Sequence, residues 1–447
     1  MDIFKIKLTP IQILVLGYAV VTLIGALLLS LPVSNAKGAY QPFIDSLFVA
    51  TSGISTSGLS VVDIGTYYSL FGQIVLMCIF QIGGIGYMTF IIFAAYLLGE
   101  KISATDSTVA KESLATRSYN YRMLGGFFRN VLLVTFFFES IGAAILALFW
   151  MKEFSLPHSI YLGIFHSVSA FCTAGFSTFS NSLMNYRSSL TVNLTINLIS
   201  LIGGIGFFVL MDIFELIHRR YKKIPGRLTL HSKMALRVTL AVIMISTLVV
   251  LITENWPATF NYYEKFISAL FQAISASTTD GFNTIDIGAM SAAGLTILMV
   301  LMFIGASPGS TGGGIKTTTL GALLVSILSY LRGKESVKVF DRELHLQTVL
   351  RAFTVFSLFV AIAIFDLIIL ANSEGVSYLR VFFEIISALG NTGLSTGITA
   401  SLTFIGKVVL IITMFIGRVG PVTIAMAFLV KKEREAVRFP KEDIFVG

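Results

Sequence analysis

Long apolar segments separated by short polar loops make up most of the 447-residue chain. A transmembrane helix needs about 20 predominantly apolar residues. The first such segment runs from Ile11 to Leu31, follows Lys5 and Lys7, and is longer than a signal-peptide core, so we interpret it as a spanning helix. The pattern predicts eight spans: 11–31, 70–98, 124–151, 190–217, 234–252, 295–331, 348–370 and 402–430.

Four shorter apolar segments lie between these spans, and they resemble one another. The stretch 48–59 has near-copies at 165–176, 271–282 and 383–394, spaced 106 to 117 residues apart. In each copy, a Phe stands ten residues before a Gly and a Ser stands six residues before it. A fixed internal spacing of this kind indicates a repeated structural unit.

Each repeated segment is long enough for a helix of about two to three turns but too short to span a bilayer. The Gly at its end permits backbone geometry that other residues resist. Irregular backbone at membrane depth persists only where it is buried in protein or lines water. Its carbonyl oxygens can then replace the hydration shell of a cation. The repeated segments therefore predict four re-entrant pore loops.

Together these patterns predict an all-α polytopic membrane protein. Four tandem helix–pore loop–helix repeats, with eight transmembrane helices and four re-entrant pore helices, would surround one pseudo-fourfold pore. The predicted boundaries are 1–99 for repeat 1, 100–217 for repeat 2, 218–331 for repeat 3, 332–430 for repeat 4 and 431–447 for a cytoplasmic tail. The candidate ion selectivity filter comprises Thr56, Ser57, Gly58, Thr173, Ala174, Gly175, Thr279, Asp280, Gly281, Asn391, Thr392 and Gly393.

The returning helices carry a second repeated motif, Ile-Gly-Gly-Ile-Gly at 82–86, with versions at 202–206, 304–306 and 416–420. Small residues allow close helix approach in membranes, and we favour that packing role for the first two copies. The third copy opens the stretch 305–314, which contains five Gly and one Pro and should break its helix. A phosphate-binding loop is not indicated, because Ile315 spoils its pattern.

We interpret 305–314 as a mobile constriction below the filter, the alternative being a static kink. In the fourth copy, Arg418 stands where the first has Gly84. A charge within a span is a functional-site hypothesis by default. Arg418 could repel cations, donate to carbonyls of the glycine-rich stretch, or pair with an acid such as Asp366 or Glu139. The candidate gate comprises Gly305, Pro308, Gly309, Gly312, Gly313, Gly314, Lys316 and Arg418, with Lys316 expected to extend toward the cytoplasm.

Three acidic residues accompany the pore segments. Asp280 precedes Gly281, where the other repeats have small neutral residues. Its carboxylate could attract cations to the pore mouth or accept hydrogen bonds from filter amides. For Asp45 and Glu384, which lie within the predicted pore helices, we favour structural hydrogen bonds over cation attraction.

The charge distribution sets the predicted orientation. The chain is 55% hydrophobic, 13% charged and carries a net charge of +8. Of its 32 Lys and Arg residues, 24 fall on one side of the predicted spans, which places both termini in the cytoplasm. This basic surface would face anionic membrane lipid, so the charge does not indicate nucleic acid as a partner. The five His form no HExxH motif or catalytic constellation, and no enzyme activity is expected.

The four filter sequences, Thr-Ser-Gly-Leu, Thr-Ala-Gly-Phe, Thr-Asp-Gly-Phe and Asn-Thr-Gly-Leu, resemble those of the Trk/Ktr/HKT superfamily of potassium transporters. The likeness covers nearly the whole chain. The eight-span length and the sequence Ser-Tyr-Leu-Arg-Gly-Lys at 329–334 look most like the bacterial Ktr membrane subunit, of KtrB/KtrD type.

The resemblance implies potassium uptake across the bacterial plasma membrane through a gated, filter-containing pore. Potassium would bind at the filter carbonyls as substrate, with no covalent cofactor and with sodium activation as an option. It also implies a homodimer and a cytosolic nucleotide-binding RCK ring as regulatory partner. Gly58 at the first filter position favours potassium, whereas Asp280 departs from the expected small residue. The alternative is a potassium/sodium-permeable or sodium-coupled transporter using alternating access, although four parallel repeats favour a single pore.

Overall fold

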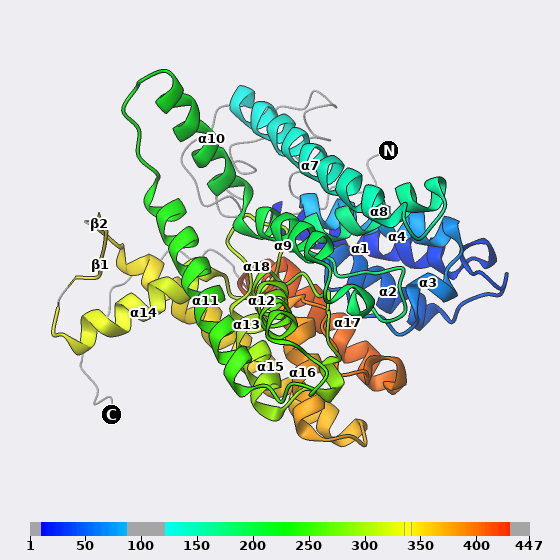
Figure 1. The fold of residues 1–447 in the computed structure, drawn as a ribbon. Helices are drawn as coiled ribbons and strands as arrows, with labels where there is room; N and C mark the ends of the chain where they lie inside the picture. The colour runs from blue at the N-terminus through cyan, green and yellow to red at the C-terminus, as the bar shows by residue number, and fades with distance from the viewer. Residues whose placement is uncertain (1–9, 87–120, 335, 341, 430–447) are drawn as a thin grey trace, which may run out of the picture.

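The structure is a computed structural model that describes residues 10–86, 121–334, 336–340 and 342–429 (Figure 1). Helices account for most of these residues. Figure 1 shows α10 and a small strand hairpin at one side of the molecule and α3 at the opposite side. The predicted tail 431–447, the end of the predicted span 70–98 and the first residues of repeat 2 lie outside the described residues.

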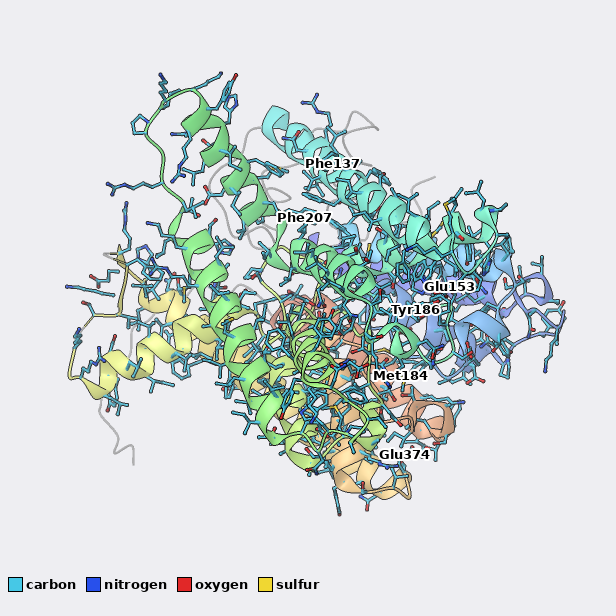
Figure 2. The ribbon with its side chains drawn as sticks, in the orientation of Figure 1. Phe137, Glu153, Met184, Tyr186, Phe207 and Glu374 are labelled. Atoms are coloured by element: carbon cyan, nitrogen blue, oxygen red, sulfur yellow. The ribbon has the colours of Figure 1, made fainter. Side chains whose placement is uncertain are left out.

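Three long helices have the length and hydropathy to cross a membrane within the described part of the chain: α7 (Tyr121–Trp150, from Phe128), α11 (Leu230–Thr253) and α15 (Leu346–Ser373). The helix α1 (Pro10–Ser30) occupies the corresponding position in the first predicted repeat. Large apolar side chains on these helices stay exposed, among them Phe137 at 59%, labelled in Figure 2, and Phe365 at 64%. Apolar surface of this extent on long helices is what a bilayer would cover.

The four repeated segments form short buried helices: α2 (Phe43–Ser55), α8 (Leu156–Phe171), α12 (Tyr262–Thr278) and α16 (Tyr378–Gly390). The Phe that begins each repeated segment is fully buried, at Phe48, Phe165, Phe271 and Phe383. These recurring aromatic residues anchor the short helices in the core, and the chain turns sharply after each helix.

The helices that follow also share a pattern. They are α4 (Leu70–Ile85), α9 (Leu190–Ile205), α13 (Ala292–Ile304) and α17 (Phe404–Val419). Each begins with a side-chain cap, in which the hydroxyl of Ser69, Ser189, Ser291 or Thr403 accepts a hydrogen bond from a backbone N–H three residues later. Each ends at a Gly with positive φ: Gly86, Gly206, Gly305 and Gly420, at 87°, 98°, 70° and 90°.

The prediction of one continuous span over 190–217 is wrong. The helices α9 and α10 (Phe207–Tyr221) meet at 96°, and Figure 2 shows Phe207 at this corner. Gly206 supplies the backbone conformation for the turn, and the Phe207 N–H donates to Gly309 O at 2.9 Å instead of to a carbonyl of α9. The predicted span 402–430 is likewise divided at Gly420, where α18 (Pro421–Leu429) begins.

The glycines before each break have the packing role that the sequence indicated. A side-chain carbon at Gly84 would lie 2.6 Å from Cys172 Sγ, and one at Gly83 would collide with Ile54 O. Gly203 approaches Phe171 O in the same way. Within one motif, therefore, the first glycines permit close contact with the end of a short buried helix, and the last glycine ends its own helix.

The remaining described elements connect these helices. On the loops lie η1 (Pro32–Ser34), α3 (Ile64–Tyr67), η2 (Met184–Tyr186), η3 (Ile287–Ala289) and η4 (Thr399–Ser401). Between α14 (Thr317–Leu331) and α15, strands β1 (Lys338–Val339) and β2 (Arg342–Glu343) form an antiparallel hairpin that the sequence pattern did not predict.

Candidate functional site

The four predicted filter glycines lie together. Each has a positive φ: 83° at Gly58, 66° at Gly175, 89° at Gly281 and 91° at Gly393. A side-chain carbon on each would strike the backbone carbonyl oxygen of the residue that precedes the next glycine. These oxygens belong, in the same order, to Ala174, Asp280, Thr392 and Ser57. The contacts therefore run from the first segment to the fourth and back to the first, so the four ring glycines form a closed cycle.

Local hydrogen bonds hold each turn in the same shape. The residue before each ring glycine donates its N–H to the carbonyl of the repeated Ser, at 2.8 to 2.9 Å; the pairs are Ser57 to Ser52, Ala174 to Ser169, Asp280 to Ser275 and Thr392 to Ser387. The Ser275 and Ser387 hydroxyls also accept from the N–H of Gly281 and Gly393. The spacing of six residues between Ser and Gly is thus the spacing that closes this turn.

The short helices point their carboxyl ends at the ring. The first residue of each turn adopts the left-handed conformation: Thr56, Thr173, Thr279 and Asn391, with φ of 50° to 57°. Three of them cap their helices, whereas Thr173 follows Cys172, the cap of α8. The carboxyl end of a helix carries a partial negative charge of about half an elementary charge. Four such ends around one ring create a region that favours a cation.

A cavity of about 340 Å³ lies on one side of the ring and is lined by the ring glycines and the residues that follow them in sequence. All four ring glycines line it, together with the residue two positions after each: Ser60, Ser177, Asn283 and Ser395. These side chains are polar and uncharged. Apolar side chains such as Val61 and Phe179 complete the lining, so the polar groups next to the ring are the ones that a hydrated cation would meet last before it.

The glycine loop, residues 305–314, lies on the opposite side of the ring. It contacts the first residue of every turn. Thr56 Oγ1 donates to Thr311 O and Thr173 Oγ1 to Thr311 Oγ1, both at 3.2 Å, while Gly313 N donates to Thr279 Oγ1 at 2.9 Å. A side-chain carbon at Gly313 would lie 3.0 Å from Asn391 Cβ. The loop therefore covers the side of the ring that faces away from the cavity.

Thr311 is the central residue of this loop, and it is not among the gate residues predicted from the sequence. Its hydroxyl donates to Phe171 O at 3.0 Å, and its N–H donates to Gly203 O at 3.3 Å. The composition of the loop drew attention to Gly and Pro. The only signal for Thr311 was a hydroxyl side chain in the middle of the glycines, and its partners are distant in sequence.

Arg418 bridges the loop to the first returning helix. Its guanidinium donates to Thr311 O and to Gly83 O, both at short range. Of the three roles considered for Arg418, the structure supports hydrogen-bond donation to a carbonyl of the glycine loop. The acids considered as partners bind elsewhere: Asp366 accepts from Thr413 Oγ1 at 2.7 Å and Glu139 from Gln81 Nε2 at 3.1 Å.

The expectation that Lys316 extends toward the cytoplasm is wrong. Its Nζ turns back and donates to Gly312 O at 2.5 Å and Gly313 O at 3.1 Å. A helix break at membrane depth leaves carbonyls that need partners, and Lys316 supplies donors to two of them. With φ of 81°, Lys316 also turns the chain into α14.

Asp280 takes neither of the two roles considered for it. The residue is 1% exposed, and its Oδ2 accepts from Ser200 Oγ on α9 at 2.5 Å. Its Oδ1 has no hydrogen-bond partner within the described residues. The carboxylate therefore lies behind the third turn and does not reach the pore mouth, because the backbone carbonyl of Asp280 already faces the neighbouring turn.

The other two acids have the structural bonds that we favoured. Asp45 pairs with Lys407 at 2.7 Å. Glu384 accepts from Ser395 Oγ, Thr396 N and Thr399 Oγ1, each at 2.8 Å, so it holds the loop after the fourth turn.

Ser200→Ala is expected to destabilise the protein by about 1–3 kcal/mol, because it removes the single described partner of a buried carboxylate. Thermal unfolding of the purified protein in detergent measures the effect as a lower Tm. Ser326→Ala is the matched control, since the Ser326 hydroxyl bonds only to Ala322 O of its own helix among the described contacts. Equal Tm values for the two variants would contradict a stabilising role for the Ser200–Asp280 bond.

Comparison with known proteins places this arrangement in a family. Residues 8–438 match the family model described as TrkH, cation transport protein. The chain belongs to the TrkH family. It is therefore a multi-pass membrane protein of a cation transport family, in agreement with its long apolar helices.

Individual relatives of this TrkH-family chain span its full length. The Ktr system potassium uptake protein B of Bacillus subtilis is 37% identical over 99% of this chain and 98% of its own. The potassium/sodium uptake protein NtpJ of Enterococcus hirae is 35% identical over 99% of this chain and 98% of its own. The crystal structure of the potassium transporter TrkH from Vibrio parahaemolyticus matches with a TM-score of 0.73 at 21% identity, over 95% of this chain and 86% of that one. The last likeness supports the overall helical fold.

Proposed function

We propose that this protein is the membrane subunit of a Ktr-type system and takes up potassium through the ring of four glycine turns. The observation that carries the proposal is the closed cycle of contacts among the ring glycines and the carbonyls of their neighbours. The full-length likeness to a Ktr potassium uptake protein supports potassium as the substrate.

The proposed architecture is four tandem repeats around one pseudo-fourfold pore. Three recurring features support it: a left-handed residue after a short helix, a ring glycine two residues later, and a capped returning helix that stops at a Gly. In this arrangement α1, α7, α11 and α15 lead into the pore helices, and the broken returning helices complete the eight membrane crossings.

In the proposed filter, potassium is the transported substrate and binds at the carbonyls of the four turns. Backbone carbonyls of a filter replace the hydration shell of the ion. The absence of side chains at the ring glycines lets the four backbones approach one another, and the four helix ends lower the electrostatic cost of dehydration. The residues of this site are those predicted from the sequence at 56–58, 173–175, 279–281 and 391–393.

The glycine loop is the proposed gate. Thr311, Lys316 and Arg418 together hold it against the ring, so an ion leaving the filter would meet the loop. Conduction therefore requires that these hydrogen bonds break or rearrange. Each bond between neutral groups contributes about 0.5–1.5 kcal/mol net, and each bond from the charged Lys316 or Arg418 about 1.5–3 kcal/mol. A regulatory signal that breaks a small set of them would shift the balance between the closed and open loop.

Thr311→Val is expected to raise the potassium flux by about two- to tenfold, because valine keeps the shape of the side chain but loses the bonds to Thr173 Oγ1 and Phe171 O. Flux into liposomes containing purified protein measures the change. Thr354→Val is the control, since the exposed Thr354 hydroxyl bonds to Leu350 O of its own helix. An unchanged flux in Thr311→Val would show that these bonds do not hold the gate.

Potassium and sodium flux in the parental protein tests the proposal itself. With a membrane potential applied across liposomes, we expect potential-driven potassium uptake that exceeds sodium uptake. Comparable sodium flux would instead support the potassium/sodium alternative, to which the name of the Enterococcus hirae relative lends weight. Flux that shows no dependence on potential would count against a pore.

The proposed partners are a second copy of the chain and a cytosolic nucleotide-binding RCK ring, with both termini in the cytoplasm. A basic cavity of about 840 Å³ supports a cytoplasmic docking region. It lies beside the hairpin and the start of α11, and Arg227, Lys233, Arg342 and His345 contribute to its lining. Adding the regulatory subunit should change the flux severalfold, and an unchanged flux in a complex that forms would contradict a regulatory role.

A further inference from the structure

An apolar cavity of about 340 Å³ lies between α13, α14, α15 and α16. Its lining includes Phe303 and Ile304 from the end of α13, Ile315 from the chain just before α14, and Phe356 and Ala363 from α15. Thr296 is the one lining residue with a polar side chain, and its hydroxyl already donates to Ala292 O at 2.7 Å. The cavity thus offers one hydroxyl acceptor, fewer than the two to four polar partners that retain a buried water.

The cavity opens on an exposed apolar surface to which α15 contributes. At its rim, Val300 is 51% exposed, Ile364 is 52% exposed and Phe356 is 40% exposed. Ile364 and Phe356 belong to α15, which is long and apolar enough to cross a membrane. A membrane-spanning α15 would place this opening against lipid hydrocarbon. The volume lies within the range of about 300–1,000 Å³ that binds small ligands.

We propose that this cavity binds an acyl chain of a membrane lipid. The chemistry is complementary, since an alkyl chain needs apolar contacts and no hydrogen bonds. The apolar side chains that line an unfilled cavity lack dispersion contacts on the side that faces the empty space. An inserted alkyl chain would supply those contacts. A bilayer presents such chains at the opening at high local concentration.

The bound acyl chain would pack directly on the two segments that flank the glycine loop, residues 303–304 and 315–316, which we call its stems. Two backbone hydrogen bonds join the stems: Ile315 N donates to Phe303 O at 3.1 Å, and Lys316 N donates to Ile304 O at 2.9 Å. Phe303 also makes edge-to-face contacts with Phe356 and Phe359, with ring centroids 5.8 and 5.9 Å apart. Filling the cavity supports this closed pairing of the stems.

A consequence, which rests on the proposed gating role of the loop, is that an occupied cavity opposes opening. Any displacement of the loop that separates the stems would move Phe303, Ile304 and Ile315, which form one wall of the cavity. Lipid composition would then set the ease of opening. The site gives the membrane itself a means of regulating flux.

Photolabelling with a phospholipid that carries a diazirine at mid-chain tests the binding site. In liposomes of this lipid, mass spectrometry of the digested protein should find adducts on Met299 or Phe303. Ala363→Trp, which fills the cavity, should reduce those adducts severalfold. Val360→Phe provides a smaller filling change should the first variant fold poorly.

The matched control is Phe365→Trp, which enlarges the residue beside Ala363 on the 64%-exposed, outward side of α15. It should leave labelling of Met299 and Phe303 unchanged, and labelling at position 365 should persist in Ala363→Trp. No adducts on the lining in the parental protein, or adducts that survive both filling variants, would overturn the proposal. Crosslinks between two copies through this face in place of lipid adducts would overturn it as well.

Potassium flux tests the link to the loop separately. Ala363→Trp should lower the flux severalfold, because its side chain acts as a permanent occupant, whereas Phe365→Trp should conduct like the parental protein. The expected labelling with unchanged flux would refute the link and leave the acyl site standing. Loss of the expected flux in the parental protein would refute the proposed function, and the labelling result would still decide the binding site.

Discussion

Gly281→Ser is expected to lower the preference for potassium over sodium by about tenfold, equivalent to about 1.4 kcal/mol. A side-chain carbon at this position would collide with Thr392 O and lie 3.3 Å from the Cα of Gly393. The φ of 89° is also strained for any residue other than Gly. The third turn must therefore shift, and the carbonyls that would select the ion lose their spacing.

The ratio of potassium to sodium flux in liposomes, at a fixed membrane potential, measures this effect. Gly397→Ser is the matched control, because Gly397 has nearly the same φ, 91°, but nothing within 4 Å of an added side-chain carbon. The control separates backbone strain from collision with the ring. Parental selectivity in a folded Gly281→Ser protein would refute the assignment of Gly281 to the filter.

Arg418→Ala is expected to raise the potassium flux by about tenfold, provided that the loop is the gate. The guanidinium is the one described group that joins Thr311 O to Gly83 O, so its removal releases the loop from the first returning helix. Hydrogen bonds from a charged donor contribute about 1.5–3 kcal/mol, which is enough to shift the balance between closed and open states by this factor.

Two further variants identify the cause of the change in flux. Arg418→Lys keeps the charge but cannot span two separate carbonyls with a planar fork, so its flux should lie between those of the parental protein and Arg418→Ala. Lys407→Ala removes a different cation from α17, one that pairs with Asp45, and should leave flux unchanged. If Arg418→Lys matched the parental protein while Arg418→Ala conducted faster, the charge alone would be the barrier.

Much of the site could be predicted from the sequence because it rests on local, repeated features. The Ser and Gly of each repeated segment are six residues apart, and the structure shows that this spacing closes a single turn through one backbone hydrogen bond. Glycine is required at 58, 175, 281 and 393 for the same reason in all four turns: a side chain there would collide with a carbonyl oxygen of the neighbouring turn. Repetition made this local rule visible.

The failed expectations concern contacts between distant segments. Nothing near Lys316 in sequence shows that carbonyls within its reach lack partners, and nothing near Asp280 points to Ser200. The bend at Gly206 was missed because an apolar segment with small residues also fits a straight helix; the bend depends on Gly309, which accepts from Phe207 N.

The sequence by itself predicted the apolar helices, the four related segments and the glycine in each, since hydrophobic length and local turn geometry depend on neighbouring residues. Only the tertiary structure decided that the glycines close into one ring, that Thr311 sits against it and that Arg418 bridges to the loop. Those features arise because backbone groups freed by the helix breaks must find partners inside the membrane, and the partners come from other repeats.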